Sequence, residues 1–152
     1  KSGPLLCELI RSSESLKGAT VEKDLVADEI DQISQSLLEF VPKVDVILTT
    51  GGTGFAPRDV TPEATNAVIE KRCGGLETAL HLRSLQATPL AALSRLCAGI
   101  KDKTLIINLP GSPKAVKECF EVVEKIIPHA VHLIRDDKEF ICGKHTEIAE
   151  SF

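Results

Sequence analysis

The chain has 152 residues, of which 43% are apolar, and this is enough for one domain with a single hydrophobic core. Its net charge of −4 gives no general attraction to nucleic acid or to acidic membranes, and no apolar run is long enough to span a bilayer. The five cysteines are widely spaced and form no CxxC motif, which argues against a zinc site and a disulfide framework. We therefore expect a protein of the reducing cytoplasm, with no membrane span and no nucleic-acid partner.

The first part of the chain predicts two helices with a strand between them. A helix beginning near Pro4 has an apolar face of leucine and isoleucine, and residues 19–26 alternate in polarity as a strand near a sheet edge does. The second helix carries an apolar stripe up to Pro42, and Asp28 precedes it where an N-cap is expected. Because the chain contains no methionine and opens on a helix, we expect that a first strand precedes residue 1.

Two short apolar, β-branched runs in the rest of the chain, residues 44–50 and 104–108, predict buried parallel strands. A helix is predicted from Thr61, its cap, to about Gly74–Gly75. A second, less regular helix is predicted over residues 76–85. A third is predicted as one continuous helix from residue 113 to about 135. Residues 88–95 fit a helix or a loop. This alternation of helix and strand predicts an α/β fold, with a parallel sheet covered by helices.

Each of the two predicted strands runs directly into a loop of small residues. Residues 51–54, GGTG, follow the first strand, and residues 110–113, PGSP, follow the second. Ligands of open α/β sheets bind where such loops leave the carboxyl ends of strands, and glycine amides at a helix start suit phosphate. The first loop matches neither a Walker A motif nor GxGxxG, but we favour nucleotide binding there over a tight turn. For the second loop both interpretations stay open.

Two aspartates are candidates for metal binding. Asp59 and the neighbouring Arg58 follow the glycine loop, where a carboxylate beside a triphosphate commonly holds Mg²⁺ and an arginine contacts phosphate. A turn aspartate bonded to its own backbone is the simpler alternative for Asp59, and a helix cap is the simpler alternative for Asp28. A parallel sheet would nevertheless bring both carboxylates to the same edge, where they could share a magnesium ion.

Residues 49–65, TTGGTGFAPRDVTPEAT, closely resemble the signature of the molybdenum-cofactor biosynthesis family. That family includes the bacterial molybdopterin adenylyltransferases, a plant two-domain enzyme and the G domain of gephyrin. Further matches are residues 26–29, with alanine in place of the usual proline, 88–89 with 93–95, and 104–111. The resemblance covers residues 1 to about 137 and leaves 138–152 as a C-terminal tail. It implies a three-layer α/β/α sandwich with a mostly parallel sheet, a homotrimer, and transfer of AMP from Mg-ATP to the molybdopterin phosphate.

The resemblance also implies which residues form the site. Asp28 and Asp59 are the expected catalytic and Mg²⁺-binding residues. The residues expected to bind ATP or molybdopterin are Thr50, Gly51, Gly52, Thr53, Gly54, Arg58, Ser94, Asn108, Leu109, Pro110, Gly111 and Ser112.

The partner expected from the resemblance is a metal-inserting domain in the same or another chain. One alternative function is a trimeric gephyrin-type scaffold that retains the molybdopterin pocket. Another is the nucleotide-processing domain of competence-damage proteins.

Overall fold

The computed structural model describes residues 1–136, so the predicted tail at 138–152 lies outside the described residues. The helices and strands in chain order are α1 (Ser2–Ser12), the 3-10 helix η1 (Glu14–Leu16), α2 (Ile30–Phe40), β1 (Val46–Thr50), α3 (Thr61–Val68), β2 (Lys71–Arg72), α4 (Gly74–Ala87), the 3-10 helix η2 (Pro89–Leu93), β3 (Ala98–Lys101), β4 (Thr104–Leu109), α5 (Pro113–Val123) and α6 (Ile127–Ile134). No helix within residues 1–136 is long and apolar enough to cross a membrane.

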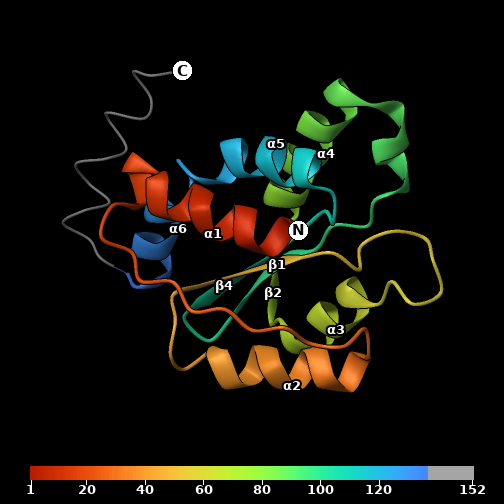
Figure 1. Ribbon diagram of the computed structural model, residues 1–152. Coiled ribbons are helices and arrows are strands. Elements are labelled where there is room, and N and C mark those ends of the chain that lie inside the picture. The colour runs from red at the N-terminus through yellow and green to blue at the C-terminus, as the bar shows by residue number, and fades with distance from the viewer. Residues whose placement is uncertain (137–152) are drawn as a thin grey trace.

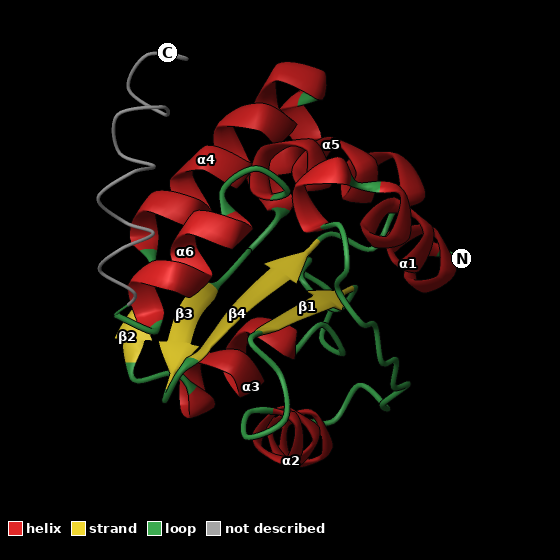
Figure 2. Ribbon diagram, turned by 90° about the vertical axis from the view of Figure 1, so that its left-hand side faces the viewer, coloured by secondary structure: helices red, strands yellow, loops and turns green. Residues whose placement is uncertain are grey.

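The elements form three layers, as expected for an α/β/α sandwich. A four-stranded sheet of order β1-β4-β3-β2 lies in the middle. Helices α1, α4, α5 and α6 cover one face, and α2 and α3 cover the other (Figures 1 and 2). Strand β4 is buried along its whole length, and its side chains alternate between two apolar clusters. Leu105, Ile107 and Leu109 pack under α5, while Ile106 packs with α2 and α3.

The two strands that carry the candidate site are neighbours. Strand β1 pairs with β4 in parallel, from Val46 opposite Leu105 to Thr50 opposite Leu109. The other two pairings, β4 with β3 and β3 with β2, are antiparallel, so the sheet is mixed. Because β1 and β4 run in the same direction and end level with each other, their following loops leave the sheet at one edge.

The structure corrects two predictions in the first part of the chain. Residues 19–26 form no strand, because most of their side chains are exposed and they pair with no strand among residues 1–136. Asp28 is not the cap of the following helix. Helix α2 begins at Ile30 with Glu29 in the cap position, and no side chain caps it.

The middle of the chain also differs from its prediction. Helix α3 ends at Val68, well before the predicted Gly74–Gly75, and Gly74 begins α4 instead. Thr61 lies in the first turn of α3, and Val60 takes the cap position. The sequence did not predict β2 and β3, which pair with each other through backbone hydrogen bonds. The Glu70 N–H, just before β2, also donates to the Ile100 carbonyl of β3 at 2.8 Å.

The prediction of one long helix from residue 113 to about 135 is wrong, because two helices occupy this stretch. Helix α5 ends at Val123 and α6 begins at Ile127, with Pro128 in its first turn. Proline lacks an N–H donor and clashes with the preceding helical turn, so it is tolerated at the start of a helix and breaks its interior.

Candidate active site

The loops after β1 and β4 touch each other at the carboxyl edge of the sheet. The Thr50 hydroxyl donates to the Pro110 carbonyl at 2.8 Å, and the Gly51 N–H donates to the Leu109 carbonyl at 3.2 Å. A Cβ atom on Gly111 would lie 3.3 Å from the Cα of Gly51. The sequence placed these residues in one site, and the structure brings them together as one continuous backbone surface.

The glycine loop needs glycine for its backbone conformation at two positions. Gly51 has φ of 96° and Gly52 has φ of 66°, which L-residues with side chains rarely adopt. A Cβ on Gly52 would also lie 2.2 Å from the Thr61 hydroxyl oxygen. The Thr61 N–H donates to the Gly52 carbonyl at 3.1 Å, so the loop is closed onto the start of α3.

A buried amide supports the loops from within the sheet. Asn108 is fully buried in β4, and its Nδ2 donates to the hydroxyls of Thr49 and Thr65, each at 2.9 Å. Its Oδ1 has no hydrogen-bond partner among the described residues. Asn108 and the equally buried Leu109 were predicted to contact ligand, but here their side chains lie beneath the loops and shape the surface from below.

The second loop leads into the N-terminus of α5, which is built to receive an anion. The Ser112 hydroxyl accepts from the Ala115 N–H at 3.2 Å, and Pro113 occupies the first turn. Gly111 and Ser112 are exposed. The free N–H groups and partial positive charge of a helix start favour phosphate or carboxylate oxygens at this position.

Asp59 lies at the end of the loop that follows the glycines. Its carboxylate Oδ2 accepts from the Ala56 N–H at 3.1 Å, and its own N–H donates to the Ala56 carbonyl at 2.9 Å. A Cβ on Gly54 would lie 2.8 Å from the same Oδ2, so the glycine gives the carboxylate its space. One carboxylate oxygen therefore orders the loop, as in the turn interpretation, and the other is left for a ligand.

Asp28 and Arg58 open onto the same groove. Its cavity volume is about 650 Å³, and it is lined by Asp28, Glu29, Ile30, Asp31, Pro57, Arg58 and Val60. Asp28 and Arg58 are both exposed. The segment before α2 and the loop before α3 thus meet at this groove. Asp59, which was expected to share an edge with Asp28, is not among the residues that line it.

No group of three or more His, Cys, Asp or Glu side chains among residues 1–136 could hold a metal ion by itself. Magnesium does not need such a group, because it usually takes one or two carboxylates and completes its shell with water and substrate phosphates. The carboxylates of Asp28 and Asp59 are oxygen ligands of the kind that Mg²⁺ takes, so their chemistry fits an ion held jointly with substrate phosphates.

Arg95 was not among the predicted site residues, yet it is hydrogen-bonded to the glycine loop. The Arg95 backbone N–H donates to the Thr53 carbonyl at 2.8 Å, and its side chain bonds to Gly54, Asp59 and Glu63. Thr53, predicted as a hydroxyl donor, is itself buried. Residues 93–95 match the family signature, but no pattern in the sequence indicated these contacts, because Arg95 bonds mainly to backbone carbonyls far away along the chain. Its neighbour Ser94 has a buried hydroxyl without a hydrogen-bond partner among the described residues.

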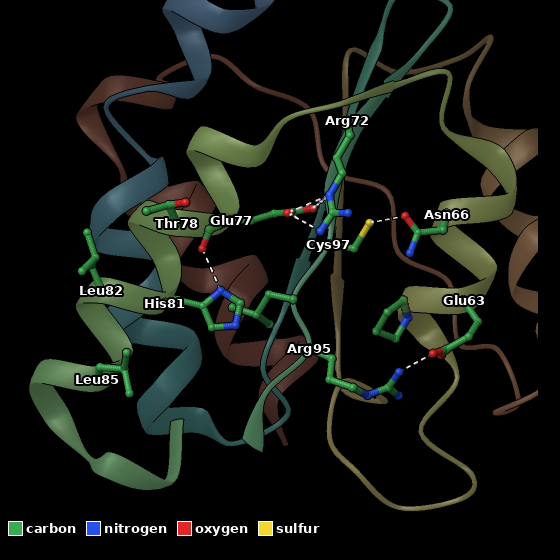
Figure 3. A pocket seen from close by; sticks show the side chains of 12 residues that line it. Glu63, Asn66, Arg72, Glu77, Thr78, His81, Leu82, Leu85, Arg95 and Cys97 are labelled. Atoms are coloured by element: carbon green, nitrogen blue, oxygen red, sulfur yellow. Dashed lines mark hydrogen bonds and ion pairs between the residues drawn. The ribbon is translucent and has the colours of Figure 1, made fainter. Parts of the chain in front are cut away.

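A second cavity of about 540 Å³ lies between α3 and α4 (Figure 3). It contains the buried carboxylate of Glu77, which accepts from Arg72 Nε at 3.0 Å and from the Ala98 N–H at 3.1 Å. Burial, together with the charge of Glu77, raises the pKa of Cys97 to about 11. Burial also raises the pKa of Cys73 and Cys119. These thiols are protonated at neutral pH and are unsuited to act as nucleophiles.

The fold and the paired loops define an α/β protein in which two loops meet at the carboxyl ends of its parallel strands, the edge where ligands of open α/β sheets bind. A family model described as "Probable molybdopterin binding domain" matches residues 1–129. The chain belongs to this family.

Curated relatives and a solved structure agree with this assignment. The "Molybdenum cofactor synthesis protein cinnamon" of Drosophila melanogaster is 50% identical over 152 residues, which are 99% of this chain and 25% of that protein. The "Molybdopterin adenylyltransferase" of Helicobacter pylori is 49% identical over 113 residues, 73% of this chain and 64% of that enzyme. The molybdopterin biosynthesis Mog protein of Mycobacterium ulcerans superposes with a TM-score of 0.80 at 36% identity, over 88% of this chain and 86% of that one. The chain thus spans less than two thirds of the length of these two curated relatives.

Proposed function

We propose that this chain transfers AMP from ATP to the phosphate of molybdopterin and releases pyrophosphate. The observation that carries the proposal is the contact between Gly51 and Gly111, which joins two phosphate-binding loops into one surface beside Asp59. A reaction between two phosphorylated substrates needs such a double site. Bacterial relatives of this chain are named molybdopterin adenylyltransferase, which supports this choice of substrates.

In the proposed reaction an oxygen of the molybdopterin phosphate attacks the α-phosphorus of ATP. The bond from that phosphorus to the bridging oxygen of the β-phosphate breaks, and pyrophosphate leaves with the electron pair. The protein supplies positioning and charge stabilisation, and it needs no nucleophile of its own. The N–H groups at the start of α5 and the exposed Arg58 are suited to hold phosphate oxygens.

The residues that would hold Mg²⁺ are Asp28 and Asp59. Asp28 presents an exposed carboxylate to the groove, and Asp59 has one oxygen beyond the one bonded to Ala56. When bound, the ion would neutralise negative charge on the triphosphate. Two carboxylates would be enough for this ion, because Mg²⁺ usually takes the rest of its ligands from substrate phosphates and water.

The same proposal includes the assembly and location of the protein. We infer a homotrimer, a cytoplasmic location and a metal-inserting domain, in this or another chain, that takes the adenylylated product. The described cysteines, Cys7, Cys73, Cys97 and Cys119, are free thiols, as is usual in a reducing compartment.

Pyrophosphate release tests the proposed activity. The chain is incubated with Mg-ATP in the presence and absence of molybdopterin, and both pyrophosphate and adenylylated molybdopterin are measured. We expect release that depends on molybdopterin and on Mg²⁺, with one pyrophosphate formed for each AMP transferred. Tight binding of molybdopterin without any release would refute the enzyme and favour the scaffold function.

A further inference from the structure

Arg95 bonds to both ends of the loop that carries Asp59. This loop, residues 54–59, begins at Gly54, whose carbonyl accepts from Arg95 Nε at 2.8 Å. It ends at Asp59, whose carbonyl accepts from Arg95 Nη2 at 2.5 Å. The third nitrogen of the guanidinium, Nη1, forms an ion pair with the Glu63 carboxylate in the first turn of α3 (Figure 3).

The loop itself has little else to keep its shape. Phe55, Ala56, Pro57 and Arg58 are all exposed. Its internal hydrogen bonds are the two between Ala56 and Asp59, one of which uses the Asp59 carboxylate. The position of that carboxylate therefore depends on where the two ends of the loop are held.

Arg95 is in turn held from both sides. Glu63 orients its guanidinium, and the hydrogen bond from Arg95 lowers the pKa of Glu63, so both partners are charged at neutral pH. On the other side, His81 Nε2 lies 3.0 Å from the carbonyl oxygen of Ser94, which fixes the backbone next to Arg95 onto α4. The guanidinium is a rigid planar fork with several N–H donors, so it can serve three acceptors at once in a way that a lysine ammonium cannot.

We propose that Arg95 is a positioning residue that fixes the 54–59 loop, and with it the Asp59 carboxylate, for AMP transfer. Arg95 Nε, Nη1 and Nη2 are each bonded to a protein acceptor, so three of the five guanidinium N–H groups are used to hold the loop and the start of α3. This inference rests on the function proposed above, but the holding of the loop can be measured without activity.

The experiment compares Arg95→Ala and Arg95→Lys with a matched control, Arg83→Ala. Arg83 also pairs with one glutamate, Glu121, and its side chain is 31% exposed, against 34% for Arg95. Arg83 makes this contact between α4 and α5, away from the loop. The measurements are backbone hydrogen exchange of residues 54–60, and kcat and KM for ATP and molybdopterin.

We expect faster exchange of the Ala56 and Asp59 amides in both Arg95 variants. In the same variants kcat falls about 10- to 100-fold with a smaller change in either KM, because misplacement of a reacting group by about 1 Å costs on this scale. Arg95→Lys keeps a positive charge beside Glu63. It therefore still tests the proposal if Arg95→Ala does not fold. Arg83→Ala leaves both the loop exchange and kcat unchanged.

Unchanged exchange of the loop in Arg95→Lys would overturn the proposal, whatever happens to activity. It would also be overturned if the loop exchanges faster while kcat stays at the wild-type value. A wild-type chain that transfers no AMP would refute the proposed function instead, and faster loop exchange in the Arg95 variants would then still establish that Arg95 holds this loop.

Discussion

The backbones of Gly51 and Gly111 are in contact, although one follows β1 and the other follows β4: a Cβ on Gly111 would lie 3.3 Å from the Gly51 Cα. The hydrogen bond from the Thr50 hydroxyl to the Pro110 carbonyl, 2.8 Å long, lies beside this contact. A change in one loop must therefore displace the other.

Gly52→Ala is expected to destabilise the protein by at least about 2 kcal/mol, because a side chain is strained at positive φ and its Cβ would meet the Thr61 hydroxyl. Gly75→Ala is the control, since Gly75 lies in the first turn of α4 and a Cβ there meets nothing within 4 Å. That variant should be stabilised by about 0.5–1 kcal/mol. Urea denaturation measures both, and equal stability of the two variants would contradict the prediction.

Asn108→Leu removes both hydrogen bonds to Thr49 and Thr65 while roughly keeping the side-chain volume. We expect a loss of about 2–3 kcal/mol in the free energy of unfolding, because the buried Thr65 hydroxyl and the partly buried Thr49 hydroxyl both lose their partner. Asn66→Ala changes an exposed amide on α3 whose Oδ1 accepts only from the weak Cys97 thiol donor at 3.3 Å, and it should cost less, about 0.5 kcal/mol. If thermal denaturation finds Asn108→Leu as stable as Asn66→Ala, the buried amide does not support the loops as described.

Asp59→Asn is expected to lower kcat about 100-fold or more while changing KM for ATP little. The amide oxygen can still accept from the Ala56 N–H, so the loop keeps its shape and only the charge is lost. Asp28→Asn should act in the same direction. Asp102→Asn, in the turn between β3 and β4, is the matched control, and wild-type turnover in Asp59→Asn would remove Asp59 from the reaction.

Glu63 gives a testable dependence of stability on pH. Its pKa is lowered from the ordinary value of 4.5, mainly by the hydrogen bond from Arg95. The unfolded chain therefore takes up this proton first as the pH falls. The stabilisation is fully present above pH 4.5 and is lost as the pH falls through the lower pKa of the folded state.

Glu63→Gln should accordingly flatten the dependence of the melting temperature on pH below about 4.5. Glu70→Gln is a matched variant, because a hydrogen bond from Lys101 lowers the pKa of Glu70 in the same way. We expect both variants to flatten the curve, but only Glu63→Gln to lower kcat, since only Glu63 orients Arg95. The assignment would be contradicted if the pH dependence stayed as steep as in the wild type in both variants and kcat fell in both.

The sequence was sufficient to predict the elements whose signal is local. Strands β1 and β4 are continuous apolar, β-branched runs, and their parallel pairing followed from the alternation of helix and strand. The contact between the two loops could be expected once the strands were parallel, because both carboxyl ends then lie at one edge. Pro128 is a local sign that a helix begins near it, as α6 does. The apolar periodicity continues through the surrounding residues, so one long helix was predicted instead.

The remaining features depend on partners that are distant in the sequence. Strand β2 has only two residues, both exposed, and exists because β3 pairs with it. Residues 19–26 alternate in polarity as a strand does, but this pattern does not depend on whether a partner strand lies next to it. Arg95 was missed for a similar reason, because its acceptors are backbone carbonyls, which any sequence supplies. Asp28 resembled a helix cap, yet the helix begins two residues later.

Strand β2 also limits how this sheet can meet another molecule. Its two residues are the cations Lys71 and Arg72, and Arg72 is tied to Glu77 on α4 by a 2.9 Å ion pair. A border this short, with positive charge on both residues, disfavours addition of a further strand from another chain. Edge-to-edge pairing of two copies is therefore disfavoured on this side of the sheet.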